Sequence, residues 1–327
     1  GIVVETGQGA YLFDCGSTSR KNIGEYVLKP YLKSRGIQSL RGVFVSHPDE
    51  DHMNGILELL ENGGEWGITV EQMFLPAITE AERREAFEKL LVAAEYAGVP
   101  VSYIKCGDEI RDSRLRLRCL HPEENTTLAD ANAYSECFYV EVFAKKMKQE
   151  AIDDRKANDA SGASAIGKIS ILLTGDVEGE GERQLTQKLQ ALQESQSLQE
   201  SRPLQESRSL QESQSLQESQ SLQESQSLQT TRRLQEQRGQ RKFRVDILKV
   251  AHHGSGYSTG TEFLATASPA TAIISCGRNN SYGHPHVEML QRLEDARVPW
   301  YGTMDYGALT VTVDSHGNRL RGYLRRK

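Results

Sequence analysis

The stretch 46-SHPDEDHMNG-55 decides the fold. It follows the apolar run 42-GVFV-45, which predicts a buried β-strand, and it places two histidines and three acids within six residues. In a loop after a strand, alternate residues project on the same side, so this spacing can turn four side chains towards one point. Imidazole nitrogens and carboxylate oxygens grouped in this way bind divalent cations. The stretch therefore predicts a metal site at a strand end, with these candidate ligands: His47, Asp49, Asp51 and His52.

Two other interpretations of this stretch are a polar loop that caps a helix and a calcium loop of the D-x-D kind. The glycine and glutamate that calcium loops carry at later positions are absent, and the flanking histidines also argue against calcium. We expect Glu50, between the two aspartates, to point to solvent. A helix is expected over 53–62, after this loop.

Two further strand ends carry side chains of the same type. Asp176 ends the apolar run 169-ISILLTGD-176, and a histidine doublet, His252 and His253, ends 245-VDILKVAHHGS-255. An aspartate after a strand is commonly a turn residue, and a single histidine is more often structural. Because three strand ends carry ligand-type side chains, a shared metal site is favoured, and which histidine of the doublet binds directly stays open.

Short strands alternate with helices along the chain, which predicts an α/β layered sandwich. Residues 145–167 are polar and are expected to form a loop. We expect strands over 10–16, 42–46, 70–74, 100–104, 114–120, 137–144, 169–176, 245–251, 270–277, 298–302, 308–313 and 319–324, and further helices over 22–35, 79–97, 258–267 and 286–296.

Residues 192–239 form a six-residue repeat of the type LQESQS. In a helix this period moves each leucine by about 240° around the axis, so no apolar stripe forms. Each repeat has one apolar residue and low strand propensity, which argues against a β-helix. We therefore expect a low-complexity insertion without a catalytic role, disordered or an isolated polar helix, in a single domain spanning 1–327.

Composition excludes several classes of protein. The 327 residues contain no apolar run of about 18, so no transmembrane segment is expected. Five cysteines without C-x-x-C spacing indicate neither a zinc ribbon nor a closed set of disulfides. The net charge of -6 argues against global attraction to nucleic acid, so such binding would need a local patch. The first residues are typical of the middle of a strand and lack an initiator Met, so the chain is expected to be truncated at its N-terminus.

The three strand-end motifs together resemble the metallo-β-lactamase superfamily, whose fold is an αββα sandwich with a binuclear metal site at one edge. A closer resemblance is to the C-terminal nuclease-like domain of the ComEC DNA-internalisation proteins. It covers the chain outside the insertion and the 145–167 loop, although the family's opening DVGQGD element is absent and 130-DANAYSE-136 matches only loosely. The matching motifs are 46-SHPDEDHMNG-55, 173-LTGDVE-178, 248-LKVAHHGSGYS-258, 275-SCGRNNSYGHPH-286 and 303-TMDYGALTV-311.

The resemblance implies two divalent metal ions, Mn or Zn, shared among these side chains. It implies His47 and Asp49 on the first metal, and Asp176 bridging the two. The second metal would take Asp51, His52 and His253. Most of the superfamily carries a histidine where this chain has Asp49, and the additional carboxylate favours manganese over zinc.

The resemblance also implies roles around the metals. The expected catalytic residues are Asp51, Asp176, His252 and His284, and the expected substrate-binding residues are Lys249, Ser255, Ser258, Asn279, His284 and His286. The first backbone N–H groups of the helix at 258–267 are expected to hold a phosphate. The plainer alternatives are a solvated tip for Lys249 and a proline-stabilised turn for the YGHPH motif.

The residues by themselves indicate a binuclear metallohydrolase, and the resemblance implies a phosphodiesterase, a nuclease that hydrolyses the non-transported DNA strand during natural transformation. Single-stranded DNA and the membrane channel portion of a longer protein are then the expected partners, on the extracellular face of a bacterial cell membrane. Two alternatives remain. One is a phosphodiesterase of a small or cell-wall-linked phosphoester, such as a phosphocholine ester, and the other is a non-catalytic DNA-binding module of the uptake channel.

Overall fold

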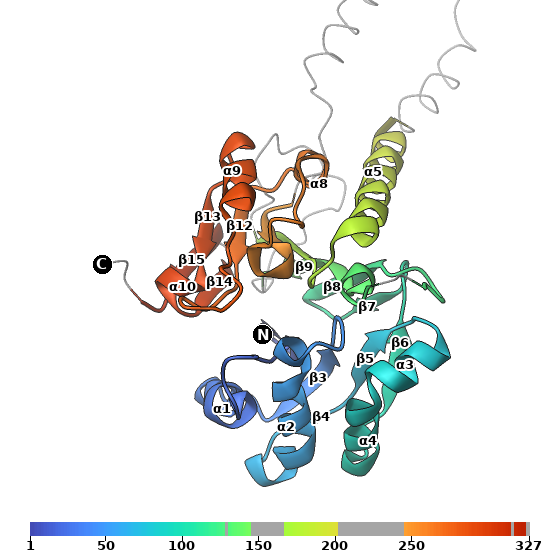
Figure 1. Ribbon diagram of the computed structural model, residues 1–327, viewed down its shortest axis with the longest axis vertical. Coiled ribbons are helices and arrows are strands. Elements are labelled where there is room, and N and C mark those ends of the chain that lie inside the picture. Colours follow the sequence, from blue (N-terminus) through green and yellow to red (C-terminus); the bar gives the residue numbers. More distant parts are fainter. Residues whose placement is uncertain (128–129, 145–166, 202–244, 315–316, 325–327) are drawn as a thin grey trace, which may run out of the picture.

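A computed structural model describes residues 1–127, 130–144, 167–201, 245–314 and 317–324, with side chains described outside 196–201. Two β-sheets pack face to face, and helices cover the outer face of each sheet (Figure 1). The expected αββα sandwich is confirmed. The predicted 145–167 loop lies outside the described residues up to position 166.

The first sheet has the strand order β1-β2-β3-β5-β6, with β4 paired to β3. Strands β1 and β2 form an antiparallel hairpin, and the other pairs are parallel. The strands are β1 (Ile2–Thr6), β2 (Gly9–Phe13), β3 (Ser39–Phe44), β4 (Thr69–Val70), β5 (Met73–Pro76) and β6 (Val101–Ile104). The helical elements of this half are the π-helical turn Gly24–Leu28, α1 (Lys29–Ser34), α2 (Glu50–Trp66), α3 (Glu80–Ala86) and α4 (Glu88–Ala97).

The second sheet has the order β13-β12-β11-β10-β9-β8-β7, parallel from β10 to β13 and antiparallel from β7 to β10. Its strands are β7 (Glu109–Arg111), β8 (Leu115–His121), β9 (Cys137–Phe143), β10 (Lys168–Leu173), β11 (Ile247–Lys249), β12 (Thr271–Ile274) and β13 (Trp300–Gly302). Its helical elements are the 3₁₀ turns Asn132–Tyr134 and Ala251–Gly254, with α5 (Gly179–Ser201), α8 (Thr261–Ala267), α9 (Val287–Asp295) and α10 (Thr303–Tyr306). Strands β14 (Leu309–Asp314) and β15 (Gly317–Gly322) form a separate hairpin.

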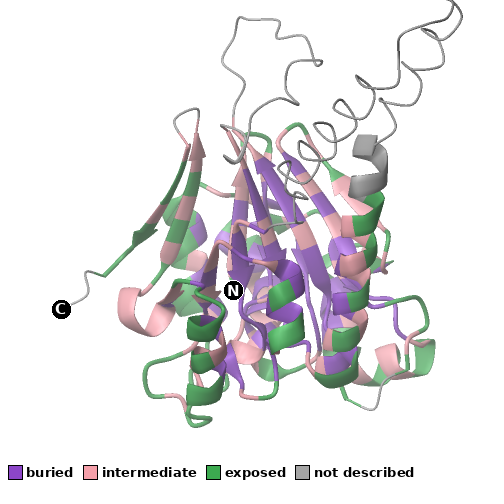
Figure 2. Ribbon diagram, turned by 90° about the horizontal axis from the view of Figure 1, so that it is seen from above, coloured by how far each residue is buried: buried purple, intermediate pink, exposed green. Residues whose placement is uncertain are grey.

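Aromatic rings fill the space between the two sheets. Phe44 stacks on Phe13 and on Phe74 with ring centroids 4.6 Å apart in each pair, and Phe138 of the second sheet meets Phe44 edge to face at 5.2 Å. Burying a side chain of this size stabilises the fold by about 1.5–3 kcal/mol. Figure 2 shows the buried residues concentrated along the central strands, so both sheets are fixed where the metal-ligand candidates emerge.

Helix α2 begins three residues earlier than the sequence predicted. Asp49, with φ -72° and ψ 146°, precedes its first turn, and Glu50 and Asp51 lie in that turn, where carboxylates interact favourably with the helix dipole. The helix ends at Gly67, whose φ of 64° is the left-handed conformation that glycine adopts readily. Two of the ligand candidates, Asp51 and His52, are therefore held on a helix and not in a flexible loop.

The predicted helix at 79–97 is instead two helices. Phe87 lies between α3 and α4 with φ -111° and ψ 16°, outside helical geometry, and its side chain is fully buried. Burial of this ring in the core thus overrides the helical periodicity of the sequence. The short strand β7 was not predicted at all.

The predicted insertion, 192–239, starts within helix α5. Helix α5 packs Leu185 and Leu189 into the core, and Leu192 packs partly buried against the same core. One residue further on, Gln193 donates a hydrogen bond from Nε2 to the carbonyl of Thr266 at 2.8 Å. The repeat therefore begins on a helix that belongs to the sandwich, and residues 202–239 of it lie outside the described residues.

Candidate metal centre

The ends of three strands bring the ligand candidates together. His47 follows β3, Asp176 follows β10, and His253 lies in the turn after β11. Strands β10 and β11 are parallel, so their carboxyl ends meet at one edge of the sheet, where α/β proteins commonly bind ligands. The close approach requires Gly175, whose φ is 50° and where a Cβ atom would lie 2.8 Å from Cβ of Ser135.

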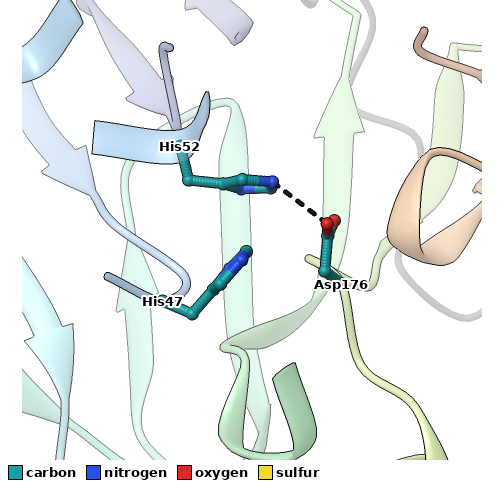
Figure 3. A group of neighbouring side chains, drawn as sticks. All are labelled: His47, His52 and Asp176. Atoms are coloured by element: carbon teal, nitrogen blue, oxygen red, sulfur yellow. Dashed lines mark ion pairs between the residues drawn. The ribbon is translucent and has the colours of Figure 1, made fainter. Parts of the chain in front are cut away.

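The first ligand group consists of His47, His52 and Asp176, whose ligand atoms lie within 4.8 Å of one another (Figure 3). All three side chains are buried, and Nε2 of His52 lies 3.2 Å from Oδ2 of Asp176. Asp49 stands at the exposed side of this group, with Oδ2 3.6 Å from Nε2 of His47. The structure thus brings Asp49 to His47, as the sequence spacing predicted.

The second ligand group consists of Asp51, His52 and His253. Nε2 of His253 lies 3.3 Å from Oδ2 of Asp51, 3.3 Å from Oδ2 of Asp176 and 3.2 Å from Nε2 of His52. Because His52 belongs to both groups and Asp176 touches both histidines of the second, the two groups form one continuous cluster.

The second ring nitrogen of each histidine in the cluster is held by a polar group. Nδ1 of His52 lies 3.0 Å from Oδ2 of Asp14, and Nδ1 of His253 donates to the carbonyl of Ser275 at 2.6 Å. Nδ1 of His47 lies 3.0 Å from Oγ of Ser46. Metal-binding histidines are almost always oriented in this way.

The surroundings of Nε2 of His47 show whether a metal ion fits the residues present. It is buried and has no hydrogen-bond partner among the described residues. A buried polar atom without a partner destabilises the fold by about 1–3 kcal/mol. Oδ2 of Asp49 lies 3.6 Å from this nitrogen, in a donor set of imidazoles and carboxylates, so a divalent cation fits the residues present.

The charges of the cluster favour a bound cation. Burial alone would lower the pKa of His52, but the carboxylates of Asp176 and Asp14 raise it to about 10. Burial would raise the pKa of Asp14, yet the charge on His52 lowers it to about 2, and the pKa of Asp176 is held well below its usual range by His52 and Lys249 despite burial. Protons on the histidines and metal ions therefore compete for the same atoms.

The two histidines of the doublet separate in space. Both adopt the left-handed conformation, with φ 45° for His252 and 53° for His253, which is unfavourable for side chains of this kind. His253 joins the ligand cluster, whereas Nδ1 of His252 lies 2.8 Å from Oε2 of Glu178. His252 therefore lies outside both ligand groups, and His253 is the direct ligand candidate.

Lys249 is not the solvated tip that was its plainer interpretation. Its side chain is buried, and Nζ donates to the carbonyl of Gly175 at 2.7 Å and to Oδ1 of Asp176 at 3.3 Å. The expected role of Lys249 in substrate binding stays a prediction. Lys249 fixes the bridging candidate Asp176 from beneath.

Two serines and a helix terminus that were predicted to bind substrate make hydrogen bonds within the protein. Ser255 and Ser258 are buried, and Oγ of Ser258 donates to the carbonyl of Ala251 while Oγ of Ser255 accepts from the amide of Tyr257. Helix α8 begins at 261, not 258, and the amides of Thr259 and Gly260 just before it donate to the carboxylate of Glu182. A phosphate would therefore have to replace these hydrogen bonds, and the predicted contacts with substrate stay predictions.

The YGHPH motif divides into two kinds of residue. Nδ1 of His286 accepts from the amide of Gly256, and Nε2 donates to the carbonyl of Tyr282, so the expected contact of His286 with substrate is not supported.

The ring of His284 lies 5.5 Å from that of His252 and 6.4 Å from that of His253, between centroids. Burial and the neighbouring histidines lower the pKa of His284 to about 4, so it is neutral near pH 7. Asn279 is exposed.

A small cavity of about 20 Å³ lies between the sheets, and its lining includes Asp14 and Lys249 as well as Glu136. Glu136 is buried, and neither of its carboxylate oxygens has a hydrogen-bond partner among the described residues. Burial, followed by the charge of Asp14, raises its pKa well above the usual value, so it is held as a neutral acid. The cavity has the volume of one water molecule.

The sequence interpretation missed two carboxylates that hold histidines of the site. Asp14 follows the apolar strand β2, which is the same strand-end pattern that drew attention to Asp176. Glu178 comes two residues after Asp176, and no sequence pattern distinguished it as a functional residue. Ser135, a loose match to the family, accepts a hydrogen bond from the amide of Asp176 at 3.2 Å and thereby helps to position it.

Parts of the chain are similar to known proteins. Residues 2–98 match the family model described as the metallo-beta-lactamase superfamily. Among solved structures, a B3 metallo-β-lactamase with an active-site glutamic acid is similar, at 12% identity and a TM-score of 0.32, over 59% of this chain and 66% of that one.

Two curated relatives match most of the chain and confirm its resemblance to the ComEC family. ComE operon protein 3 of Bacillus subtilis is 28% identical over 290 residues, which are 87% of this chain and 27% of that protein. Recombination protein 2 of Haemophilus influenzae is 24% identical over 293 residues, which are 89% of this chain and 24% of that protein. The chain spans about a quarter of the length of these relatives. Within its described part, no helix is both long and apolar enough to cross a membrane.

Proposed function

We propose that this chain is a metal-dependent phosphodiesterase that hydrolyses DNA, with the non-transported single strand of natural transformation as its substrate. The observation that carries the proposal is the cluster of histidines and aspartates from three strand ends, with Nε2 of His47 left for a metal. The similarity to ComE operon protein 3 supports the link to DNA uptake.

The cluster divides naturally between two divalent ions. His47 and Asp49 would hold the first ion, and Asp176, which lies between the two groups, would bridge to the second. The second ion would take Asp51, His52 and His253. Three carboxylates in this set favour Mn over Zn. Bound ions of this kind lower the pKa of water and neutralise charge that develops on a phosphoryl oxygen.

The protein's own residues supply orientation and a proton. Lys249 and the hydroxyl of Ser135 fix Asp176 from two directions. Glu178 holds Nδ1 of His252, so Nε2 of His252, which has no hydrogen-bond partner among the described residues, is available to protonate the leaving oxygen of the phosphodiester. His284, neutral and adjacent to His252, is the second candidate for contact with substrate.

The relatives also suggest where the chain acts. It spans about a quarter of their length, so we propose that it works as one part of a longer protein whose channel portion lies in the membrane. The site would then face the extracellular side of a bacterial cell, where the strand that is not imported is released. Membrane fractionation of the full-length protein, with protease accessibility from outside the cell, tests this placement.

The activity is tested by metal removal and replacement. The chain is stripped with a chelator and then supplied separately with Mn²⁺, Mg²⁺ or Zn²⁺, and cleavage of single-stranded DNA is compared with cleavage of bis-p-nitrophenyl phosphate. We expect no cleavage without metal and restored cleavage of both substrates with Mn²⁺. Hydrolysis of the small diester alone would favour a phosphodiesterase of small phosphoesters. DNA binding without any hydrolysis would favour a non-catalytic module.

A further inference from the structure

Three aromatic rings lead from the metal centre to the surface. The ring of His253, a ligand candidate, lies 6.4 Å from that of His284, with an interplanar angle of 18°. The ring of His284 lies 5.7 Å from that of Tyr282, with an angle of 22°. These centroid separations are within the range of offset stacked aromatic pairs. Tyr282 is thus the outer member of a stack that begins at the metal centre.

The outer ring is held in place but not buried. The side chain of Tyr282 is 58% exposed, and its carbonyl accepts a hydrogen bond from Nε2 of His286 at 3.1 Å. Asn280 closes the loop, because its Nδ2 donates to the carbonyls of Gly277 and His284 and its Oδ1 accepts from the amide of His284. These hydrogen bonds fix the backbone of the loop, and the ring of Tyr282 packs on that of His284, so little conformational entropy is lost when a ligand packs on it.

We propose that Tyr282 stacks on a nucleobase of the substrate strand, next to the phosphate held at the metal centre; this rests on the function proposed above. Tyr282 packs on His284, and its exposed surface is available to a second planar ring. Base stacking on an aromatic ring is largely independent of sequence, since every base has a flat face. A base in a duplex is already stacked and paired, so Tyr282 selects for single strands.

A measurement of oligonucleotide binding tests the stacking of Tyr282 independently of DNA cleavage. The full chain, loaded with Zn²⁺, is titrated with a single-stranded phosphorothioate oligonucleotide that contains 2-aminopurine and resists cleavage. Stacking quenches 2-aminopurine fluorescence, and the titration gives Kd. We expect Tyr282→Ala to abolish the quench and to raise Kd about tenfold. Tyr282→Phe should keep both, because the ring and not the hydroxyl makes the contact.

The matched control is Tyr96→Ala, which removes a 92% exposed tyrosine from α4 in the outer helix layer, and it should leave quench and Kd unchanged. An abasic oligonucleotide provides a second test, since Tyr282→Ala should not weaken its binding. Equal quench and Kd for Tyr282→Ala and wild type would overturn the proposal, as would a wild type that does not bind the oligonucleotide. If Tyr282→Ala lost the fluorescence quench but the wild type did not cleave DNA, stacking by Tyr282 would be supported and the proposed nuclease activity would be refuted.

Discussion

Nδ1 of His252 lies 2.8 Å from Oε2 of Glu178, whereas the adjacent His253 directs Nε2 at Asp51 and Asp176. Two consecutive histidines in the left-handed conformation therefore face different partners. One joins the ligand cluster, and the other is oriented by a carboxylate beside it. The mechanism proposed above therefore takes His252, and not His253, as the proton donor.

Glu178→Gln tests that assignment through the leaving group. Without the carboxylate, His252 is less well oriented, so cleavage of DNA should slow by about tenfold or more. The p-nitrophenolate of bis-p-nitrophenyl phosphate leaves without a proton, so kcat for this substrate should change little. Glu180→Gln, which removes an exposed acid paired with Arg183, is the control and should affect neither substrate. An equal loss on both substrates in Glu178→Gln would contradict proton donation by His252.

Asp14→Asn tests the orientation of a ligand histidine. Asp14 holds Nδ1 of His52, and loss of such a carboxylate lowers metal affinity by about 10–100-fold. Competition with a chromogenic chelator measures this affinity. The control is Asp112→Asn, which changes a carboxylate bonded to the hydroxyls of Thr6 and Tyr11 instead. Unchanged metal affinity in Asp14→Asn would show that Asp14 does not position His52.

Glu136→Gln tests a buried acid by the pH dependence of stability. The folded state raises the pKa of Glu136 well above that of the unfolded chain, so the unfolded state loses its proton first as pH rises. Stability is therefore highest below the unfolded pKa, about 4.3, and falls as pH rises towards the folded pKa. In chelator-treated protein, Glu136→Gln should remove this loss, so that its advantage in melting temperature over wild type is larger at pH 8 than at pH 5. A pH-independent difference would contradict a neutral Glu136.

The sequence predicted the sandwich, and it predicted that the candidate ligands meet at one edge of it, because both depend on local pattern. Apolar runs such as 169–174 predict strands, and polar residues after them meet at one edge whatever the details of the loops. The same reasoning applied to Asp14 would have found the partner of His52, since it also follows an apolar strand.

The remaining features depend on contacts that no local pattern carries. From the sequence, Lys249 at the end of β11 is typical of a solvated side chain. Only the position of Asp176 shows that the two form an ion pair. Glu182 of helix α5 accepts a hydrogen bond from the amide of Gly260, just before α8. Leu192 packs against the core, although the repeat around it has no apolar stripe. In each case a partner distant in sequence decides the role.

The central claim is that the cluster is the metal centre of a phosphodiesterase, and the neighbouring acids Asp51 and Glu50 offer its most direct test. Asp51 lies 3.3 Å from His253, whereas Glu50 is exposed in the same turn of α2. The measurement is the rate of cleavage of a single-stranded oligonucleotide with saturating Mn²⁺, in folded Asp51→Asn and Glu50→Gln. We predict that Asp51→Asn loses about 100-fold or more while Glu50→Gln keeps the wild-type rate. Equal rates in the two variants would contradict the claim.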